Sequence, residues 1–333
     1  MTRVLALRTA TVCLAGLAAA LAVAVAAIGR GSFAIPPGTV VDVLLGGGTP
    51  GQRLIIMDLR LPRILAALLV GAALAVSGAL TQTVARNPLA SPDVLGVTSG
   101  ASLGAVALIV LAGPAAAGVP LAALGGGLLA ALGVYLLAWR RGVDGYRLVL
   151  VGLGVGEIVQ SGVSWFLVRA DIVDATKATI WLNGSVAGAG WAQVGPLAIA
   201  LAVLLPAALA TSFTLRALQF DDDVARSLGV RLQAARLAVV LVAVALAAVA
   251  VSAAGPIEFV AFVVPQVALR LCGGSRPPML ASAALGALLV AAADLAARTV
   301  LPGRELPVGL VTAIAGAPYL LWLLVRDNRR NTA

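Results

Sequence analysis

Histidine is absent from this 333-residue sequence, which has two cysteines, Cys13 and Cys272, and a single lysine, Lys177. With no histidine and so few cysteines, the chain cannot form a zinc finger, a histidine-ligated haem site or a disulfide framework, and we predict no metal site. Lys177 is not preceded by the glycines of the phosphate-binding pattern G-x-x-x-x-G-K-[ST], so we expect any ATP to be hydrolysed by another chain. Without a histidine base or a cluster of metal ligands, a membrane-embedded enzyme is also disfavoured.

Charged residues are scarce as well, at 11% of the chain, whereas 61% of the residues are hydrophobic. Soluble domains have about 25% charged and about 45–50% apolar residues, so this composition is typical of a membrane protein. A transmembrane helix needs about 20 apolar residues. We therefore predict an all-α, polytopic membrane protein with about ten transmembrane helices, near residues 10–28, 61–83, 94–112, 118–139, 148–168, 191–211, 233–253, 256–271, 279–300 and 307–325.

Two of these runs need comment. The run at 256–271 is short and contains Pro265, so we expect a broken or tilted element whose free carbonyl group is satisfied by neighbouring protein. The first run follows basic residues, as in a signal peptide. Because nine further spans follow it, we interpret it as a retained first helix.

The arginines and the lysine predict the orientation of the chain. With the N-terminus inside, the cytoplasmic connections have fifteen Lys and Arg residues and the external ones have eight, which by the positive-inside rule predicts that both termini are cytoplasmic. This bias accounts for most of the net charge of +9. Nucleic acid is not an expected partner, because a soluble basic surface with interleaved aromatic residues is missing.

Two connections are too long to be simple turns. The external segment 29–60 mixes Pro-Pro and Gly-Gly-Gly with short apolar pieces, and we expect it to lie along the outer membrane interface. The cytoplasmic segment 215–236 is the longest polar run. In it, Asp222 or Asp223 is placed to cap a short helix, and Gly229 is placed to end that helix.

Away from the ends of the expected spans, only Glu157 and Asp294 carry a formal charge. An ionised group at the bilayer centre costs at least about 2.5–3.5 kcal/mol, so each needs water or a partner. Asp294 is four residues before Arg298, a spacing that allows an ion pair on one helix face. Glu157 is followed by Gln160 and two serines on the same side, which indicates either the wall of a water-filled cavity or hydrogen bonding between helices.

Four blocks of sequence resemble one family of membrane proteins. They are LRLPRILAALLVGAALAVSGALTQTVARNPLASPDVLGVTSGASLGA (59–105), IWLNGSVAGAGW (180–191), DDDVARSLGVRLQAAR (221–236) and the pair GPIEFVAFVVPQ and ELPVGLVTAIAGAPYLLWLLVR within 255–326. In this order they are similar to the FecCD-type permeases of ABC importers for iron–siderophore complexes, haem and vitamin B12. The resemblance covers nearly the whole chain.

The resemblance implies a single transmembrane permease domain over residues 1–333, with the type II ABC importer fold, in the bacterial inner membrane. It also implies a second permease subunit, two ATPase subunits that bind ATP and Mg²⁺, and an extracytoplasmic substrate-binding protein, with no cofactor on this chain. The implied cargo is a ferric siderophore, with vitamin B12 or haem as the alternative. An ion-coupled secondary transporter is the competing class, because such carriers also use lone intramembrane carboxylates and broken helices.

The family's functional positions map onto particular residues of this sequence. The resemblance implies that the binding protein docks on Arg60, Arg63 and Arg298. It implies a pathway and gate that include Asn87, Glu157, Gln160 and Gln266. It implies coupling helices within 215–236 that contact the ATPase through Asp222, Asp223, Val224, Ala225, Arg226, Ser227, Leu228 and Gly229.

Two positions depart from the family pattern. Gln266 stands where many members have histidine, and this form resembles the second permease of importers that use two different permease chains. We therefore favour a heterodimer over a homodimer. Glu258 stands where a small or apolar residue is usual, and the sequence does not say whether it faces the pathway.

Overall fold

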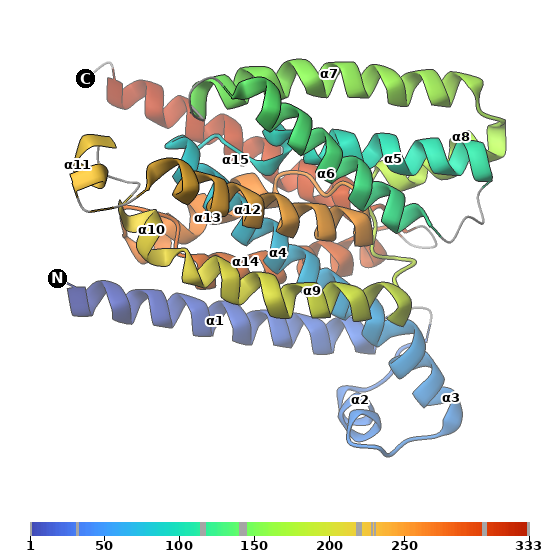
Figure 1. Ribbon diagram of the computed structural model, residues 1–333. Coiled ribbons are helices and arrows are strands. Elements are labelled where there is room, and N and C mark those ends of the chain that lie inside the picture. Colours follow the sequence, from blue (N-terminus) through green and yellow to red (C-terminus); the bar gives the residue numbers. More distant parts are fainter. Residues whose placement is uncertain are drawn as a thin grey trace.

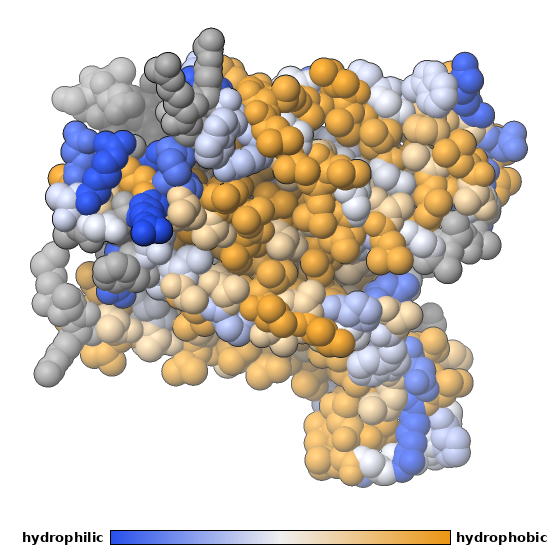
Figure 2. Space-filling view, in the orientation of Figure 1, coloured by the Kyte–Doolittle hydropathy of each residue, from blue (hydrophilic) through white to orange (hydrophobic). Residues whose placement is uncertain are grey.

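The protein is a bundle of helices whose axes run between two ends (Figure 1). The computed structural model describes residues 2–30, 33–113, 118–139, 145–217, 222–227, 229, 231–301 and 305–331. Hydrophobic side chains cover the middle of the visible face, and hydrophilic side chains gather towards its two ends (Figure 2). This distribution is the one that a bilayer requires, because hydrocarbon meets the middle of the bundle and water meets its ends.

All ten expected spans are helices. They are α1 (Thr2–Gly29), α4 (Leu61–Ala85), α5 (Val97–Ala112), α6 (Val119–Ala138), α7 (Gly145–Arg169), α9 (Trp191–Ala210), α12 (Leu232–Ala254), α13 (Val260–Cys272), α14 (Met279–Thr299) and α15 (Val308–Asn331). Within the described residues, seven helical segments are long and apolar enough to cross a membrane. The other three expected spans correspond to the shorter apolar helices α5, α13 and the first part of α15.

Shorter elements connect these helices at the two ends of the bundle. They are α2 (Pro37–Leu44), α3 (Pro50–Arg53), the π-helix η1 (Leu54–Arg60), the 3₁₀ helix η2 (Pro92–Leu95), α8 (Ile172–Leu182), α10 (Ser212–Ala217) and α11 (Asp222–Ser227). Both termini lie at the same end as α10 and α11, and α8 lies at the opposite end with α2 and α3 (Figure 1). An even number of membrane crossings requires the termini to share an end in this way.

The segment 29–60 forms short helices at the end of the bundle opposite the termini (Figure 1). Its helices α2 and α3 make a lobe that projects sideways (Figure 1), and residues from Pro50 onward join α4 in one helical segment that reaches Ala85. In the π-helical stretch the Leu61 N–H donates to the Ile56 carbonyl, five residues earlier. Because Pro62 has no N–H to donate, the wider π register lets the helix continue through it. The second span therefore begins about ten residues earlier than the apolar run suggests.

Helix α4 is the centre of the bundle. In the most apolar window of its helical segment 78% of residues are buried, against 28% in α1. It packs closely on α14, where a Cβ atom at Gly71 would overlap the Gly286 carbonyl group and a Cβ atom at Gly286 would overlap that of Gly71. A Cβ atom at Gly78 would likewise overlap the Ala261 carbonyl of α13. Small residues thus let three backbones meet directly, as is common in membrane helices.

Helix α13 continues through Pro265, and the chain is broken before the helix instead. Residues 255–258 are not helical, and Phe259 has a left-handed backbone with φ of 65°. The Ser185 N–H donates to the Ala254 carbonyl at 2.7 Å, so the end of α12 is satisfied by the chain that follows α8. Neighbouring protein thereby supplies the hydrogen bonds that a break inside a membrane protein needs.

We predict that Gly71→Ala destabilises the protein, because the added methyl group forces α4 away from α14. Overpacking of this kind costs about 1–3 kcal/mol, so the melting temperature of the detergent-purified chain should fall by several degrees. Gly125→Ala in α6 is the matched control, since a Cβ atom there meets nothing within 4 Å. Equal melting temperatures for the two variants would contradict the close α4–α14 contact.

Candidate functional site

A cavity of about 730 Å³ opens between η2, α5, α7 and the loop before α13. Its volume is within the roughly 300–1,000 Å³ of typical small-molecule sites. The described residues that line it are Leu89, Ser91, Asp93, Thr98, Ser99, Ser102, Gln160, Leu182, Pro256, Glu258, Phe259, Phe262 and Leu320. We call this space the central cavity.

The central cavity has a mixed lining of apolar and polar side chains, and its charged groups are acidic. Asp93 and Glu258 supply two carboxylates, and Thr98 donates a hydrogen bond to Asp93. Among the described lining residues there is no arginine or lysine. Glu258, whose direction the sequence left open, thus faces this cavity. An acidic wall attracts positive groups and repels negative ones.

Helix α7 contributes an exposed polar face. Gln160 lines the central cavity, and Glu157 is exposed on the same helix, near the middle of a segment long enough to span a membrane. The serines do not bond to other helices, because Ser161 Oγ donates to the Glu157 carbonyl at 2.9 Å and Ser164 Oγ to the Gln160 carbonyl at 3.1 Å. A carboxylate exposed at this depth requires water or a second protein beside it rather than lipid.

A second cavity, of about 420 Å³, lies at the end of the bundle that carries the termini. The structure brings Asn87 and Gln266 together in its wall. Gln82, which sequence reasoning missed, joins α4 to α13: it accepts from Gln266 Nε2 at 2.8 Å, and its own Nε2 donates to the Phe262 carbonyl at 2.9 Å. We call this space the inner cavity.

The partition between the two cavities is built from α4 and α13. Phe262 lines the central cavity, while its carbonyl group holds Gln82 in the wall of the inner cavity. Gln266 is buried behind this contact, with 6% of its surface exposed. The amide pair therefore fixes α13 against α4 between the two cavities.

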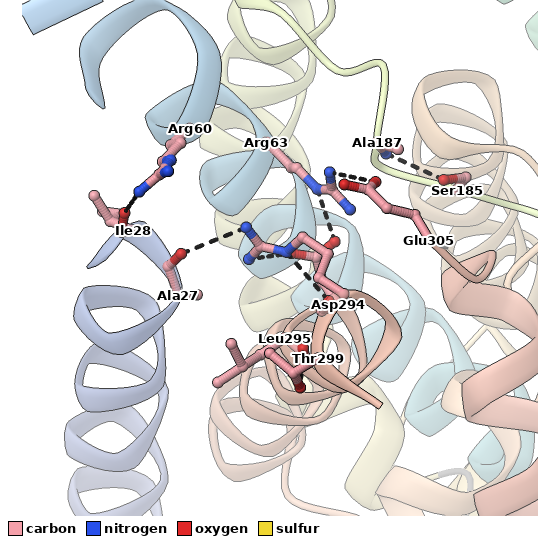
Figure 3. A network of polar contacts seen from close by, with 11 residues as sticks. Ala27, Ile28, Arg60, Arg63, Ser185, Ala187, Asp294, Leu295, Thr299 and Glu305 are labelled. Carbon is pink, nitrogen blue, oxygen red and sulfur yellow. Dashed lines mark hydrogen bonds and ion pairs between the residues drawn. The ribbon is translucent and has the colours of Figure 1, made fainter. Parts of the chain in front are cut away.

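An ion cluster lies where α4 meets α14 (Figure 3). Asp294 is fully buried and pairs with Arg63 at 2.9 Å and with Arg298 at 2.8 Å. Arg63 also pairs with Glu305, at 2.9 Å. The expected pairing of Asp294 with Arg298 is confirmed, whereas the roles of Arg63 and Glu305 have no local signal in the sequence.

The same cluster reaches the C-terminal end of α1 (Figure 3). Arg60 donates to the Ile28 carbonyl at 2.6 Å, and Arg298 donates to the Ala27 carbonyl at 3.4 Å. The last carbonyl groups of a helix have no partner within the helix and form the negative end of its dipole, so arginines are favourable there. Two arginines, Arg60 from η1 and Arg298 from α14, thus hold the end of a third helix.

These contacts change the interpretation of the three arginines. The side chains of Arg63 and Arg298 are only 10% and 8% exposed, and both are bonded to Asp294. The docking role that was inferred from the sequence supposed free surface cations. Arg63 and Arg298 are not free surface cations. Arg60 is partly exposed, and Glu305 is the most accessible member, with 55% of its side chain exposed.

Helix α11 has one buried and one exposed side. Ala225 is completely buried in the main core, whereas Asp223, Val224, Arg226 and Ser227 are exposed. Asp223 does not cap the helix, because it lies in the first turn and pairs with Arg226 at 2.7 Å. The expected end of the helix is supported by Gly229, which has φ of 79°. The Asp222 side chain and all of Leu228 lie outside the described residues.

We predict that Asp294→Ala strongly destabilises the protein, because it leaves two arginines buried without their counter-ion. Breaking a buried pair in this way costs about 3–5 kcal/mol. Glu305→Gln is the control: its side chain is half exposed, and loss of such a pair costs about 0–1 kcal/mol. Thermal unfolding followed by tryptophan fluorescence measures both, and similar melting temperatures would show that Asp294 is not the centre of the cluster.

Comparison with known proteins places this geometry in a family. The model of the FecCD transport family matches residues 6–326. The chain is 39% identical over 300 residues to the ferric enterobactin transport system permease protein FepG of Escherichia coli K12, covering 90% of this chain and 91% of that one. It is 40% identical over 311 residues to the achromobactin transport system permease protein CbrC of Dickeya dadantii, covering 92% and 89%.

Two further comparisons extend this result. The chain is 37% identical over 304 residues to the vitamin B12 import system permease protein BtuC of Klebsiella pneumoniae, covering 89% of this chain and 88% of that one. Its fold matches a solved structure described as a metal-chelate type ABC transporter in an inward-facing conformation, with a TM-score of 0.83, 26% identity, and coverage of 95% and 99%. This chain is a multi-pass membrane protein that belongs to the FecCD transport family.

Proposed function

We propose that this chain is a permease subunit of an ABC importer that moves a ferric siderophore into the cell. The observation that carries the proposal is the match of the family model along residues 6–326. ATP hydrolysis is assigned to two partner ATPase subunits, with Mg²⁺ bound there, and cargo delivery to an extracytoplasmic binding protein. The membrane would be the bacterial inner membrane, with both termini in the cytoplasm.

The proposed cargo rests on the names of the similar permeases and on the volume of the central cavity. Permeases named for ferric enterobactin and achromobactin are 39% and 40% identical to this chain. The volume of about 730 Å³ is large enough for a chelate rather than a bare ion. Vitamin B12 is the second candidate, favoured by the 37% identity with a vitamin B12 permease.

The coupling surface is proposed to be the exposed side of α11. Buried Ala225 seats the helix on the bundle, and the exposed side chains Asp223, Val224 and Arg226 are presented away from it. Val224 is 46% exposed at the polar end of the bundle, where an apolar side chain gains from a protein partner. The ATPase is the partner that the family resemblance implies at this position.

The binding protein is proposed to dock at the ion cluster and to change the ion pairs of Arg63. The cluster has three arginines and two carboxylates, and so carries a net positive charge. Arg63 Nη2 is buried and has no hydrogen-bond partner among the described residues. A carboxylate of the docking protein would replace the accessible Glu305 on Arg63 and would also meet Arg60.

A second permease subunit is proposed to cover the exposed face of α7. It would enclose Glu157 and complete the central cavity, so that the carboxylate faces a water-filled pathway. The Gln82–Gln266 pair would then be the inner gate, with Asn87 beside it. Because Gln266 replaces a histidine that is frequent in the family, we favour a related but different permease as the second subunit.

We predict ATP-dependent uptake of a ferric siderophore by vesicles that contain this chain, a related permease, the ATPase and the binding protein. Radiolabelled iron supplied as ferric chelates, and labelled vitamin B12 in parallel, measure the cargo. Uptake driven by an ion gradient without ATP would instead identify a secondary transporter. Preferential uptake of vitamin B12 would identify the second candidate cargo.

The same vesicles test the subunit composition. Omission of the related permease should abolish uptake if the pathway needs two different chains. Full activity with differently tagged copies of this chain alone, and recovery of both tags in one complex, would establish a homodimer.

We predict that Val224→Asp weakens binding of the ATPase without changing the melting temperature, because Val224 is exposed and α11 is seated by Ala225. Co-purification of a tagged ATPase measures the binding. Val173→Asp is the matched control, since Val173 is 57% exposed on α8 at the opposite end. Equal recovery of the ATPase with both variants would remove α11 from the coupling surface.

A further inference from the structure

A groove of about 770 Å³ runs beside the N-terminal half of α1, and it shares only Ser275 and Arg276 with the inner cavity. Most of its wall is apolar. The residues that line it include Leu5, Ala6, Ala10, Leu14 and Leu280. Leu14 is 67% exposed and Leu280 is 55% exposed, so a long apolar wall is left without a protein cover in this chain.

One end of the groove is strongly basic. Arg216 of α10 and Arg276 of the α13–α14 loop both line it. Arg8 is close by, because its guanidinium group would lie 3.2 Å from a Cβ atom at Gly273. No acidic residue is among the described residues that line the groove.

The two lining arginines repel each other. Burial, and then the charge of Arg216, lower the pKa of Arg276 below its ordinary value. Arg276 uses Nη1 to donate to the Ser212 carbonyl of the segment that begins α10, at 3.1 Å. The Arg216 side chain is exposed in the groove. Two like charges with no carboxylate among the described residues of the lining are stabilised by a bound anion.

The position of the basic end fits a lipid headgroup. It lies at the end of the bundle that carries both termini (Figure 1), which the excess of arginines assigns to the cytoplasmic leaflet. From there the apolar wall continues along α1, whose side chains Leu7, Leu14 and Leu21 are more than half exposed. A charged end at headgroup level followed by an apolar wall at the level of the acyl chains has the shape and polarity of one phospholipid.

We propose that this groove binds an anionic phospholipid of the inner leaflet, with its phosphate on Arg216 and Arg276 and an acyl chain along α1. Basic pockets between transmembrane helices on the cytoplasmic side bind anionic headgroups by this chemistry. A free phosphate ion would use only the basic end and would leave the apolar wall uncovered. The inference depends on the chain lying in a membrane, and it is independent of the cargo and of the partner subunits.

Native mass spectrometry of the full-length chain in detergent tests the proposal with dioleoyl-phosphatidylglycerol and dioleoyl-phosphatidylcholine. These two lipids share their acyl chains and differ in headgroup charge. We expect tighter binding of the phosphatidylglycerol. Because an arginine near anionic lipid contributes a factor of about five to affinity, Arg216→Gln should weaken that binding about fivefold, and the double change with Arg276→Gln about 25-fold.

Two matched variants separate the headgroup from the acyl chain. Arg169→Gln removes the same charge from the opposite end of the bundle and should leave the affinity unchanged. Ala10→Phe fills the apolar wall with both arginines intact and should also weaken binding. Arg216→Gln alone is the cleaner headgroup test, because Ser275 and Arg276 also line the inner cavity.

Three results would overturn the proposal. The first is equal affinity for the two lipids. The second is an effect of Arg169→Gln as large as that of Arg216→Gln, which would reflect net charge alone. The third is displacement of phosphatidylglycerol by millimolar inorganic phosphate together with no effect of Ala10→Phe, which would mean an anion site without an acyl chain.

Discussion

The contact of Gly71 with Gly286 sets how closely the two central helices of the bundle approach. In a bilayer the surrounding lipid is as apolar as the helix surfaces, so helices associate through close packing and polar contacts rather than through exclusion of water. Where both residues lack a side chain, backbone meets backbone. The position of α14 then fixes Asp294, which in turn fixes Arg63 and the end of α1. The geometry of the ion cluster therefore depends on the two glycines, Gly71 and Gly286, which have no side chain to separate the helices.

The helices were predictable and the contacts between them were not. Continuous apolar length is a local property, so each of the ten expected spans is a helix, including the short one around Pro265. The ion pair between Asp294 and Arg298 was predictable for the same reason, because four residues form one turn. Arg63 lies 231 residues from Asp294 in the sequence, and no local pattern indicates that they meet. That missing information made Arg63 and Arg298, both largely buried, look like surface cations.

The residues of the candidate pathway were also not predictable from local sequence alone. Gln82 is one polar residue in an apolar span, and its importance follows only from its bonds to α13. Glu258 is similar, since the loop that precedes α13 directs it to the central cavity. The resulting electrostatics are uneven along the bundle. The central cavity has two carboxylates and no described cation in its lining, whereas the inner cavity has Arg86 and Arg276 in its wall. A chelate moving between them would pass from an acidic to a basic surface.

The π-helical stretch before Pro62 has a mechanical consequence. Because it carries the helix through the proline, one continuous segment of 36 residues runs from Pro50 to Ala85. At 1.5 Å per residue such a segment is about 54 Å long, and a tilt of about 5° displaces one end by about 5 Å relative to the other. One end of this rod holds the projecting lobe and the other holds Gln82 with the inner amide pair. If this segment tilts about its middle, the lobe and the end at Gln82 move in opposite directions.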